Sequence, residues 1–328
     1  MAFVAAAAGL IAFPLVDANG YHTSVGLMIG IYALANLGLN LLLGNTGQIS
    51  LGQAAFFGIG AYTAGNISER IDWAARGLEA WGFWFGSLGA ALFAGLAGCA
   101  IGFFAVRLKG HYLAIATLGF QVIFSTVVLE WYPVTGGPGG FQLSAPVRLG
   151  SFDFASDARY FYLTWAFVGI AFVAVRRLER SRIGRALHAI KEYEGLAEAC
   201  AVSPVRYKLQ VFTLAAGLAG FAGSLYAHHV RSIGPASFSV QISLTWLVMI
   251  VVGGLGTAWG ALVGTASLYV LPEVVRAVSA LPWFSEALRH RLSDNNVQGL
   301  VFGLVLGVFV LFVPKGVVGT LDRRRRAS

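Results

Sequence analysis

Long stretches without a charged residue divide this chain. Eight of them are long enough to matter: 1–16, 18–68, 80–106, 110–129, 160–175, 209–230, 232–272 and 295–314. A charge at the centre of a membrane helix costs about 2.5–3.5 kcal/mol on an insertion scale, and one span takes about 20 residues. The pattern therefore predicts membrane-spanning helices. The stretches 18–68 and 232–272 have room for two each, which gives ten candidate segments.

Both of the longest stretches contain a glycine-rich interruption, at 44–50 and at 253–257. The segments beside these breaks are short, so each pair is either two spans or a re-entrant hairpin. Both alternatives return the chain to the side from which it came. We predict an all-α polytopic membrane protein with about 8–10 transmembrane segments, including broken or re-entrant helices.

The basic residues predict how the chain is oriented. With the loop 176–208 in the cytoplasm, 15 Lys and Arg residues fall inside and 8 fall outside, as the positive-inside rule requires. Both termini are then cytoplasmic, and 131–159 is an extracytoplasmic loop. The net charge is +8. The basic residues that produce it lie beside the apolar stretches, so they indicate orientation in a bilayer and not a nucleic-acid partner. Residues 1–328 form a single transmembrane domain.

Composition narrows the class further. The chain is 57% hydrophobic and 12% charged, about half the charge of a soluble domain, which excludes a soluble globular protein. The apolar stretches are continuous and not alternating, which disfavours a β-barrel. The 42 glycines suit close helix packing in a bilayer. Cys99 and Cys200 imply no disulfide framework.

The loop 176–208 is the one long polar stretch on the predicted inside. Ser181 can cap a helix that begins near Ile183 or Gly184, and Ser203-Pro204 can start the next long helix. An apolar stripe at helical spacing, interrupted by Gly195, comprises Leu187, Ile190, Leu196 and Ala197. We expect two short amphipathic helices on the inner face. They are either an ordinary linker or a docking site for a cytoplasmic partner.

Polar residues within the apolar stretches are functional candidates because they are costly there. Asn36 and Asn40 share a helix face and are expected to form interhelical hydrogen bonds. Other polar residues gather at the first break, which is either a turn at the cytoplasmic surface or the border of a wet path. The candidate translocation path comprises Asn40, Thr46, Gln48, Ser50 and Gln53. The break at 253–257 is expected to pack close to it.

The sequence carries no sign of an active site. It has no G-x-x-x-x-G-K-[ST] phosphate-binding loop, no His/Cys/Asp cluster with metal-ligand spacing and no nucleophile elbow. We therefore expect no enzyme activity, no metal and no cofactor. An ion-coupled secondary transporter of small polar solutes is the alternative class. It would need an intramembrane Asp or Glu, and the eight stretches contain none.

Several blocks of the sequence resemble the permease subunits of branched-chain amino acid ABC importers of the LivM type. They run over 37–62, 107–120, 135–140, 181–187 and 253–260, in the order and spacing of that family. The resemblance implies a multi-pass subunit of the inner membrane that imports a small amino acid. Its implied partners are a second homologous permease, two cytoplasmic ATP-binding subunits and an extracytoplasmic solute-binding protein.

The resemblance also assigns a role to the cytoplasmic loop. Residues 184–201 correspond to the coupling helix that sits in a groove of the ATPase, and Glu198-Ala199 matches the acidic-small pair of the importers' "EAA" loop. The implied coupling residues are Gly184, Arg185, Glu194, Glu198 and Ala199.

Three positions depart from the pattern. Ala201 stands where the family usually has Gly, Gln53 where many relatives have His, and Asn45 where an aromatic residue is common. These departures do not change the predicted class of transporter. They do leave the substrate undecided, because relatives carry amides and urea as well as branched-chain amino acids.

Overall fold

A computed structural model describes residues 20–279, except 72, 74–80, 107, 109–110, 145–146, 150–151 and 155, together with Gly303 and Gly307. The long helices are α2 (Tyr21–Thr46), α3 (Gln53–Arg70), α4 (Gly82–Ala105), α5 (His111–Glu130), α7 (Asp157–Arg180), α10 (Pro204–Val230), α11 (Val240–Gly253) and α12 (Ala258–Ser279). The short elements are α6 (Tyr132–Thr135), η2 (Gly137–Gly139), β1 (Phe141–Gln142), β2 (Arg148–Leu149), β3 (Phe152–Asp153), α8 (Arg182–Glu192), α9 (Glu194–Ala199), β4 (Ser232–Ile233) and η3 (Pro235–Phe238).

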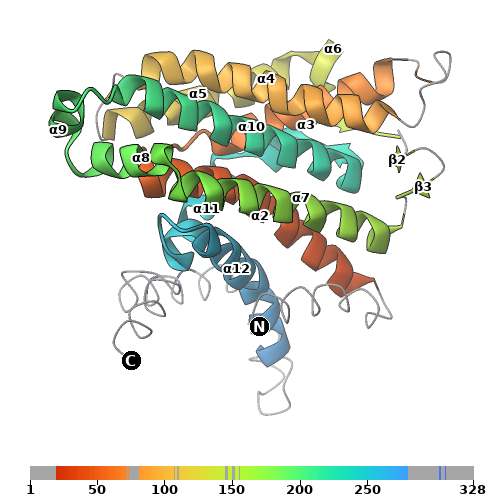
Figure 1. Ribbon diagram of the computed structural model, residues 1–328. Helices are drawn as coiled ribbons and strands as arrows, with labels where there is room; N and C mark the ends of the chain where they lie inside the picture. The colour runs from red at the N-terminus through yellow and green to blue at the C-terminus, as the bar shows by residue number, and fades with distance from the viewer. Residues whose placement is uncertain are drawn as a thin grey trace.

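The long helices lie side by side in one bundle. Helix α10 packs against α2, α3 and α4, and α2 packs against α7, α10 and α12. Helices α8 and α9 lie at one end of the bundle, and strands β2 and β3 lie at the other (Figure 1). Five described helices are long and apolar enough to cross a membrane, namely α2, α4, α5, α7 and α10. The fold is therefore an all-α polytopic membrane protein, as predicted.

The breaks fall where the glycine-rich sequences predict them. Helices α2 and α3 fill the stretch 18–68 and are separated by residues 47–52. In the stretch 232–272, β4 and η3 come first, and α11 and α12 follow. Helices α11 and α12 meet at an angle of 117°, so they form either one broken span or a re-entrant loop. Counting that pair once, the described helices supply up to six spans. The stretches 1–16 and 295–314 lie outside the described residues, and the predicted placement of both termini in the cytoplasm remains a prediction.

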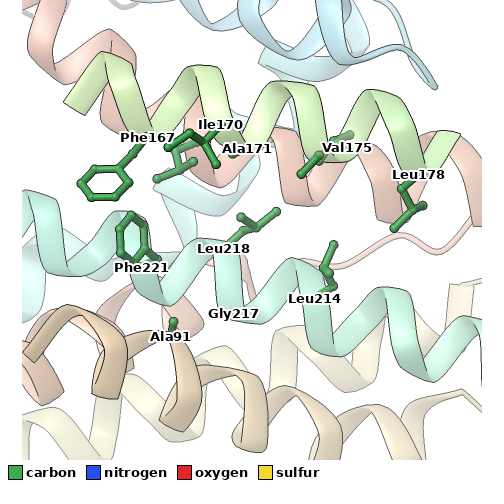
Figure 2. Close-up of a pocket in the computed structure, with 12 residues that line it drawn as sticks. Ala91, Phe167, Ile170, Ala171, Val175, Leu178, Leu214, Gly217, Leu218 and Phe221 are labelled. Carbon is green, nitrogen blue, oxygen red and sulfur yellow. The ribbon is translucent and has the colours of Figure 1, made fainter. Parts of the chain in front are cut away.

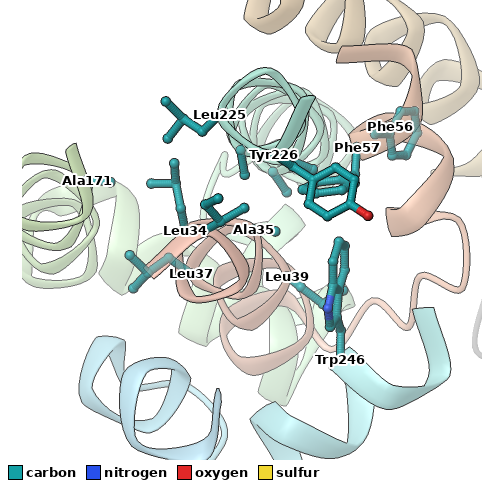
Figure 3. Packing of buried hydrophobic residues seen from close by; sticks show 14 of the residues in the cluster. Leu34, Ala35, Leu37, Leu39, Phe56, Phe57, Ala171, Leu225, Tyr226 and Trp246 are labelled. Carbon is teal, nitrogen blue, oxygen red and sulfur yellow. The ribbon is translucent and has the colours of Figure 1, made fainter. Parts of the chain in front are cut away.

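The core of the bundle surrounds α2. Leu34, Leu37 and Leu39 of this helix are at most 1% exposed, and α3, α7, α10 and α11 send side chains toward them (Figure 3). Phe57 and Trp246 close one side of the cluster, with ring centroids 5.1 Å apart. Glycine allows the close approach of α3 and α10, because a Cβ on Gly60 would overlap the backbone of Gly220.

Short elements fill the segment 131–159 at the far end from α8. Strand β1 pairs with β4 and β2 pairs with β3, both antiparallel. Asn66 of α3 donates to the carbonyl of Val134 (2.9 Å), and the Thr135 hydroxyl donates to the carbonyl of Val128 (2.7 Å). These bonds tie the segment to α3 and α5. Its placement outside the cell remains a prediction.

Candidate functional site

The two glycine-rich breaks pack against each other. A Cβ on Gly44 would overlap the backbone of Gly256, so the contact requires glycine. Asn40, one turn earlier on α2, donates from Nδ2 to the carbonyl of Thr257 (2.6 Å) and accepts from the amide of Gly256 (3.0 Å). The sequence-based expectation that the 253–257 break lies close to the first one is confirmed. Asn40 joins them with one side chain.

The five predicted path residues are all buried, between 0% and 5% exposed. The Thr46 hydroxyl donates to the carbonyl of Leu42 (2.5 Å) and lies 3.2 Å from Gln48 Oε1. Gln53 donates from Nε2 to the carbonyl of Ala215 (3.2 Å), which ties the start of α3 to α10. The hydroxyl of Ser50 has no hydrogen-bond partner among the described residues. In this conformation the predicted path residues are therefore covered by protein, although Gly47, between them, is exposed.

Side chains from other helices satisfy the first amides of α3. Its N-cap residue Gly52 has no side chain to cap them, and the first amides of a helix lack intrahelical acceptors. In the first turn, the amide of Ala54 donates to Ser243 Oγ (2.9 Å) and that of Ala55 to Gln121 Oε1 (2.7 Å). Just before the N-cap, the amide of Leu51 donates to Thr117 Oγ1 (2.9 Å). Sequence reasoning missed these three acceptors. The available signal was a polar residue in an otherwise apolar stretch.

Asparagines line the face of α2 that meets α11 and α12. Asn36 donates from Nδ2 to Thr265 Oγ1 (2.7 Å) and to Met249 Sδ (3.4 Å), so its predicted interhelical hydrogen bonds are confirmed. Asn40 differs from the prediction, because its partners lie in the break between α11 and α12 and not on a helix. Asn45 is 0% exposed, and neither polar atom of its amide has a partner in the described part of the chain. An unpaired buried amide costs free energy. The break therefore holds an unsatisfied polar group in this conformation.

The loop between α7 and α10 forms the two short helices that the sequence predicts. Ser181 caps α8 by accepting from the amides of Ile183 (3.1 Å) and Gly184 (3.4 Å). Gly184 is buried, and a Cβ there would overlap the carbonyl of Glu179. This glycine therefore serves the turn between α7 and α8.

The other implied coupling residues lie farther along the loop. Glu194 pairs with Lys208 of α10 at 2.9 Å, so it anchors α9 within the chain. Arg185, Glu198 and Ala199 are exposed.

Two details of this loop differ from expectation. The helical run is interrupted at Tyr193 and not at Gly195, which lies within α9. Leu196 belongs to the predicted apolar stripe, but it is 67% exposed, and Tyr193 is 72% exposed. The bend at Tyr193 turns α9, so the periodicity of α8 does not continue through it. These two apolar side chains add to the exposed surface of the loop.

The departure at Ala201 has a structural consequence. Ala201 has φ 61°, in the left-handed region, and the amide of Val202 donates to the carbonyl of Ala197 (3.0 Å). This is a helix C-terminal motif in which glycine is the usual residue. A side chain in this conformation costs about 1–2 kcal/mol. The loop therefore carries backbone strain at a position where glycine would relieve it.

Lys191 connects the loop to the breaks. Its Nζ donates to the carbonyl of Gly44 (2.8 Å). The last turn of α2 has no basic residue of its own, and its final carbonyls lack intrahelical donors. A cation is favoured at that end of a helix. Helix α8 thus directly contacts the residue at which the two breaks meet.

A large apolar cavity elsewhere in the bundle does not suit a polar solute. It has a volume of about 440 Å³ and lies between α7 and α10, with Ala91 of α4 at its edge (Figure 2). All of its lining residues are apolar, including Phe167, Ile170, Leu214 and Phe221. Such a surface offers no partner for an ammonium or a carboxylate group. It is suited to hydrocarbon.

Comparison with known proteins places the chain in a family. It matches the family described as "Branched-chain amino acid transport system / permease component" over residues 22–311. It is 33% identical to the high-affinity branched-chain amino acid transport system permease protein LivM of Escherichia coli (strain K12), over 94% of this chain and 72% of LivM.

Two further relatives carry similar names. The LivM protein of Salmonella typhimurium (strain LT2) is 32% identical, with the same coverage. A probable branched-chain amino acid transport permease protein LivM of Methanocaldococcus jannaschii is 22% identical over 89% of this chain and 91% of that protein. No solved structure matches. Because the match extends over most of the chain and includes both breaks and the loop between α7 and α10, the chain belongs to the family of permease components of branched-chain amino acid transport systems.

Proposed function

We propose that this chain is a permease subunit of an ATP-driven importer that carries branched-chain amino acids across the inner membrane. A permease component moves solute and is not itself an enzyme. Two separate cytoplasmic ATP-binding subunits hydrolyse ATP, a second homologous permease completes the pathway, and an extracytoplasmic solute-binding protein delivers the amino acid. The observation that carries this proposal is the family match over residues 22–311.

Reconstitution tests the proposal. The chain is assembled with a second permease and two ATP-binding subunits in lipid vesicles, and uptake of labelled leucine is measured with and without ATP. We expect uptake to require ATP and the binding protein, and to be competed by isoleucine and valine. If urea or short amides were taken up in preference to leucine, the proposed substrate class would change from branched-chain amino acids to those compounds. Ion-driven uptake by the chain alone would support a secondary transporter instead.

The exposed side of α8 and α9 is the proposed docking surface for an ATP-binding subunit. Its exposed residues are Arg185, Tyr193, Leu196, Glu198 and Ala199. It combines apolar side chains with the two charged residues Arg185 and Glu198, and an apolar face is what helix-in-groove contacts use. Gly184 and Glu194 support the surface from inside the chain, since one is buried in a turn and the other pairs with Lys208.

Charge inversion at Glu198 tests this surface. We predict that Glu198→Arg lowers ATP-driven uptake at least tenfold, because a like-charge contact in a docking groove costs several kcal/mol. Glu198→Gln removes the charge without inverting it and should cause a smaller loss. Copurification of the ATP-binding subunits should fall in the same order. Normal uptake and normal copurification in Glu198→Arg would show that the partner docks elsewhere.

The breaks are the proposed inner end of the translocation path. Gln48 and Gln53 are at most 4% exposed here, so a cysteine at either position should resist a hydrophilic thiol reagent in this conformation. In a chain lacking Cys99 and Cys200, we predict that trapping ATP in the complex changes the labelling of both positions. The native Cys200, which is exposed, serves in a separate chain as the control for reagent access. A lack of reaction at both positions in every state would make the break a packed structural turn.

A further inference from the structure

A second cavity lies at the end of α2 remote from the coupling loop. It is an open cavity lined by residues of α2, α11 and α12. Its volume of about 370 Å³ lies within the range of roughly 300–1,000 Å³ of small-molecule sites. The residues that matter chemically are Tyr32, Thr245, Trp246, Met249, Tyr269 and Glu273. Lys191 contacts the opposite end of α2, at Gly44. The cavity and the breaks therefore lie at the two ends of one 26-residue helix.

Aromatic and aliphatic side chains form the walls of this cavity. The ring centroid of Tyr32 lies 5.5 Å from that of Trp246 and 5.6 Å from that of Tyr269. Met249 and Leu268 complete the apolar surface. Such walls are suited to a branched aliphatic side chain, which gains free energy on leaving water.

The same cavity contains acceptors for a cation. The hydroxyl of Tyr21 donates to Glu273 Oε2 (2.9 Å), which places a carboxylate in the lining. Pro272, inside α12, has no amide hydrogen to donate to the carbonyl of Leu268, four residues earlier. Leu268, Pro272 and Glu273 all line the cavity. The carboxylate of Glu273 and the carbonyl of Leu268, which lacks its usual amide donor, thus lie close together along α12.

One face of α2 leads from the cavity to the breaks and carries polar side chains. Tyr32, Asn36, Asn40 and Gly44 are spaced four residues apart, so they share a face. Asn36 bonds to Thr265, one turn deeper on α12 than Tyr269, and Asn40 bonds to the second break. The Oδ1 atom of Asn36 is buried and has no partner among the described residues. It is an available acceptor between the cavity and the breaks.

We propose that the cavity between α2, α11 and α12 binds one free amino acid with a branched aliphatic side chain before the molecule moves along α2 toward the breaks. The apolar walls hold the side chain, and Glu273 with the carbonyl of Leu268 holds the ammonium group. This inference rests on the proposed function because it takes the same substrate class. The apolar cavity between α7 and α10 lacks all of these polar groups.

Protection of an introduced cysteine tests the site. Thr245→Cys, in a chain whose Cys99 and Cys200 are replaced by serine, is treated with a small hydrophilic thiol reagent in the assembled complex without binding protein. We expect leucine to slow the labelling and 4-methylpentanoate, which is leucine without its ammonium group, to leave it unchanged. Ile242→Cys, also in the cavity lining, gives an independent second position.

Glu273→Gln provides the matched variant. It keeps an acceptor for Tyr21 but removes the charge, so leucine should protect about tenfold more weakly, the size expected for one hydrogen bond to a charged group. Glu130→Gln, the same change at an exposed carboxyl at the end of α5, should leave protection unchanged. Equal protection in Glu273→Gln and the unmodified chain would overturn the assignment of Glu273.

Uptake of leucine by the same complex separates the two proposals. Leucine uptake without protection at position 245 or 242 overturns the cavity site and leaves the proposed function in place. Protection by a lipid extract but not by leucine makes the cavity a lipid cleft and also overturns the site. Absence of leucine uptake under every condition overturns the proposed function itself.

Discussion

Helices α2 and α5 are similarly apolar but occupy opposite environments. In their most apolar windows, 83% of the α2 residues are buried inside the protein, against 28% in α5. Helix α5 exposes large apolar side chains such as Ile115 (66%) and Ile123 (63%). Helix α2 carries asparagines at 36, 40 and 45 and glycine at 44, all buried. Apolarity alone therefore marks a membrane helix, whereas polar and small residues mark the helix at the centre of the bundle.

The largest expected difference between the two helices concerns glycine. We predict that Gly44→Val on α2 prevents the breaks from packing, because the added carbons would overlap the backbone of Gly256. Backbone cannot rotate aside, so the cost should reach or exceed the upper end of the about 1–3 kcal/mol of an overpacked core. Gly119→Val on α5 is the control, since a Cβ there meets no described atom within 4 Å. Yield of folded protein and thermal unfolding in lipid nanodiscs measure both, and equal loss in both would contradict the comparison.

Two asparagines of α2 sharpen the comparison, because replacing each by leucine should change the free energy of unfolding in opposite directions. Asn40→Leu leaves the amide of Gly256 without its acceptor and removes one of the donors to the carbonyl of Thr257, and we predict a loss of about 2 kcal/mol. Asn45→Leu removes an amide that has no described partner, and we predict a gain of about 1 kcal/mol. Thermal unfolding in nanodiscs measures the sign. Destabilisation by Asn45→Leu would mean that a bound water or ligand satisfies the amide.

Several local features of the fold follow from short-range rules that the sequence carries. Ser181 and Ser203-Pro204 mark the starts of α8 and α10, and the glycine-rich sequences mark both breaks, because capping and chain reversal depend on neighbouring residues. The contacts between helices could not be predicted in this way. That α3 borrows acceptors from Thr117, Gln121 and Ser243 depends on which helices become neighbours.

The same limit applies to the loop between α7 and α10 and to the cavity between α2, α11 and α12. The spacing of apolar residues places Leu196 on the same stripe as Leu187 and Ile190. The bend at Tyr193 changes the direction of α9, and the spacing does not predict that bend. The cavity joins α2 to α12 across more than 200 positions of sequence, as the bond from Tyr21 to Glu273 illustrates. Only the packed structure reveals that these residues are close together.

The smallest expected effect concerns the exposed side of α5. Ile123 is 63% exposed, and lipid tails are as apolar as the side chain itself. We therefore predict that Ile123→Ala changes the free energy of unfolding in nanodiscs by less than about 0.5 kcal/mol. The measurement is made on the chain alone and again on the assembled complex. A loss of about 2–5 kcal/mol, typical of a buried large-to-small change, that appears only in the complex would show that a partner subunit covers this face. In that case the exposed side of α5 would be an interface with the proposed second permease. Both α2 and α5 would then be buried in the assembled complex, α2 within its own chain and α5 against the partner.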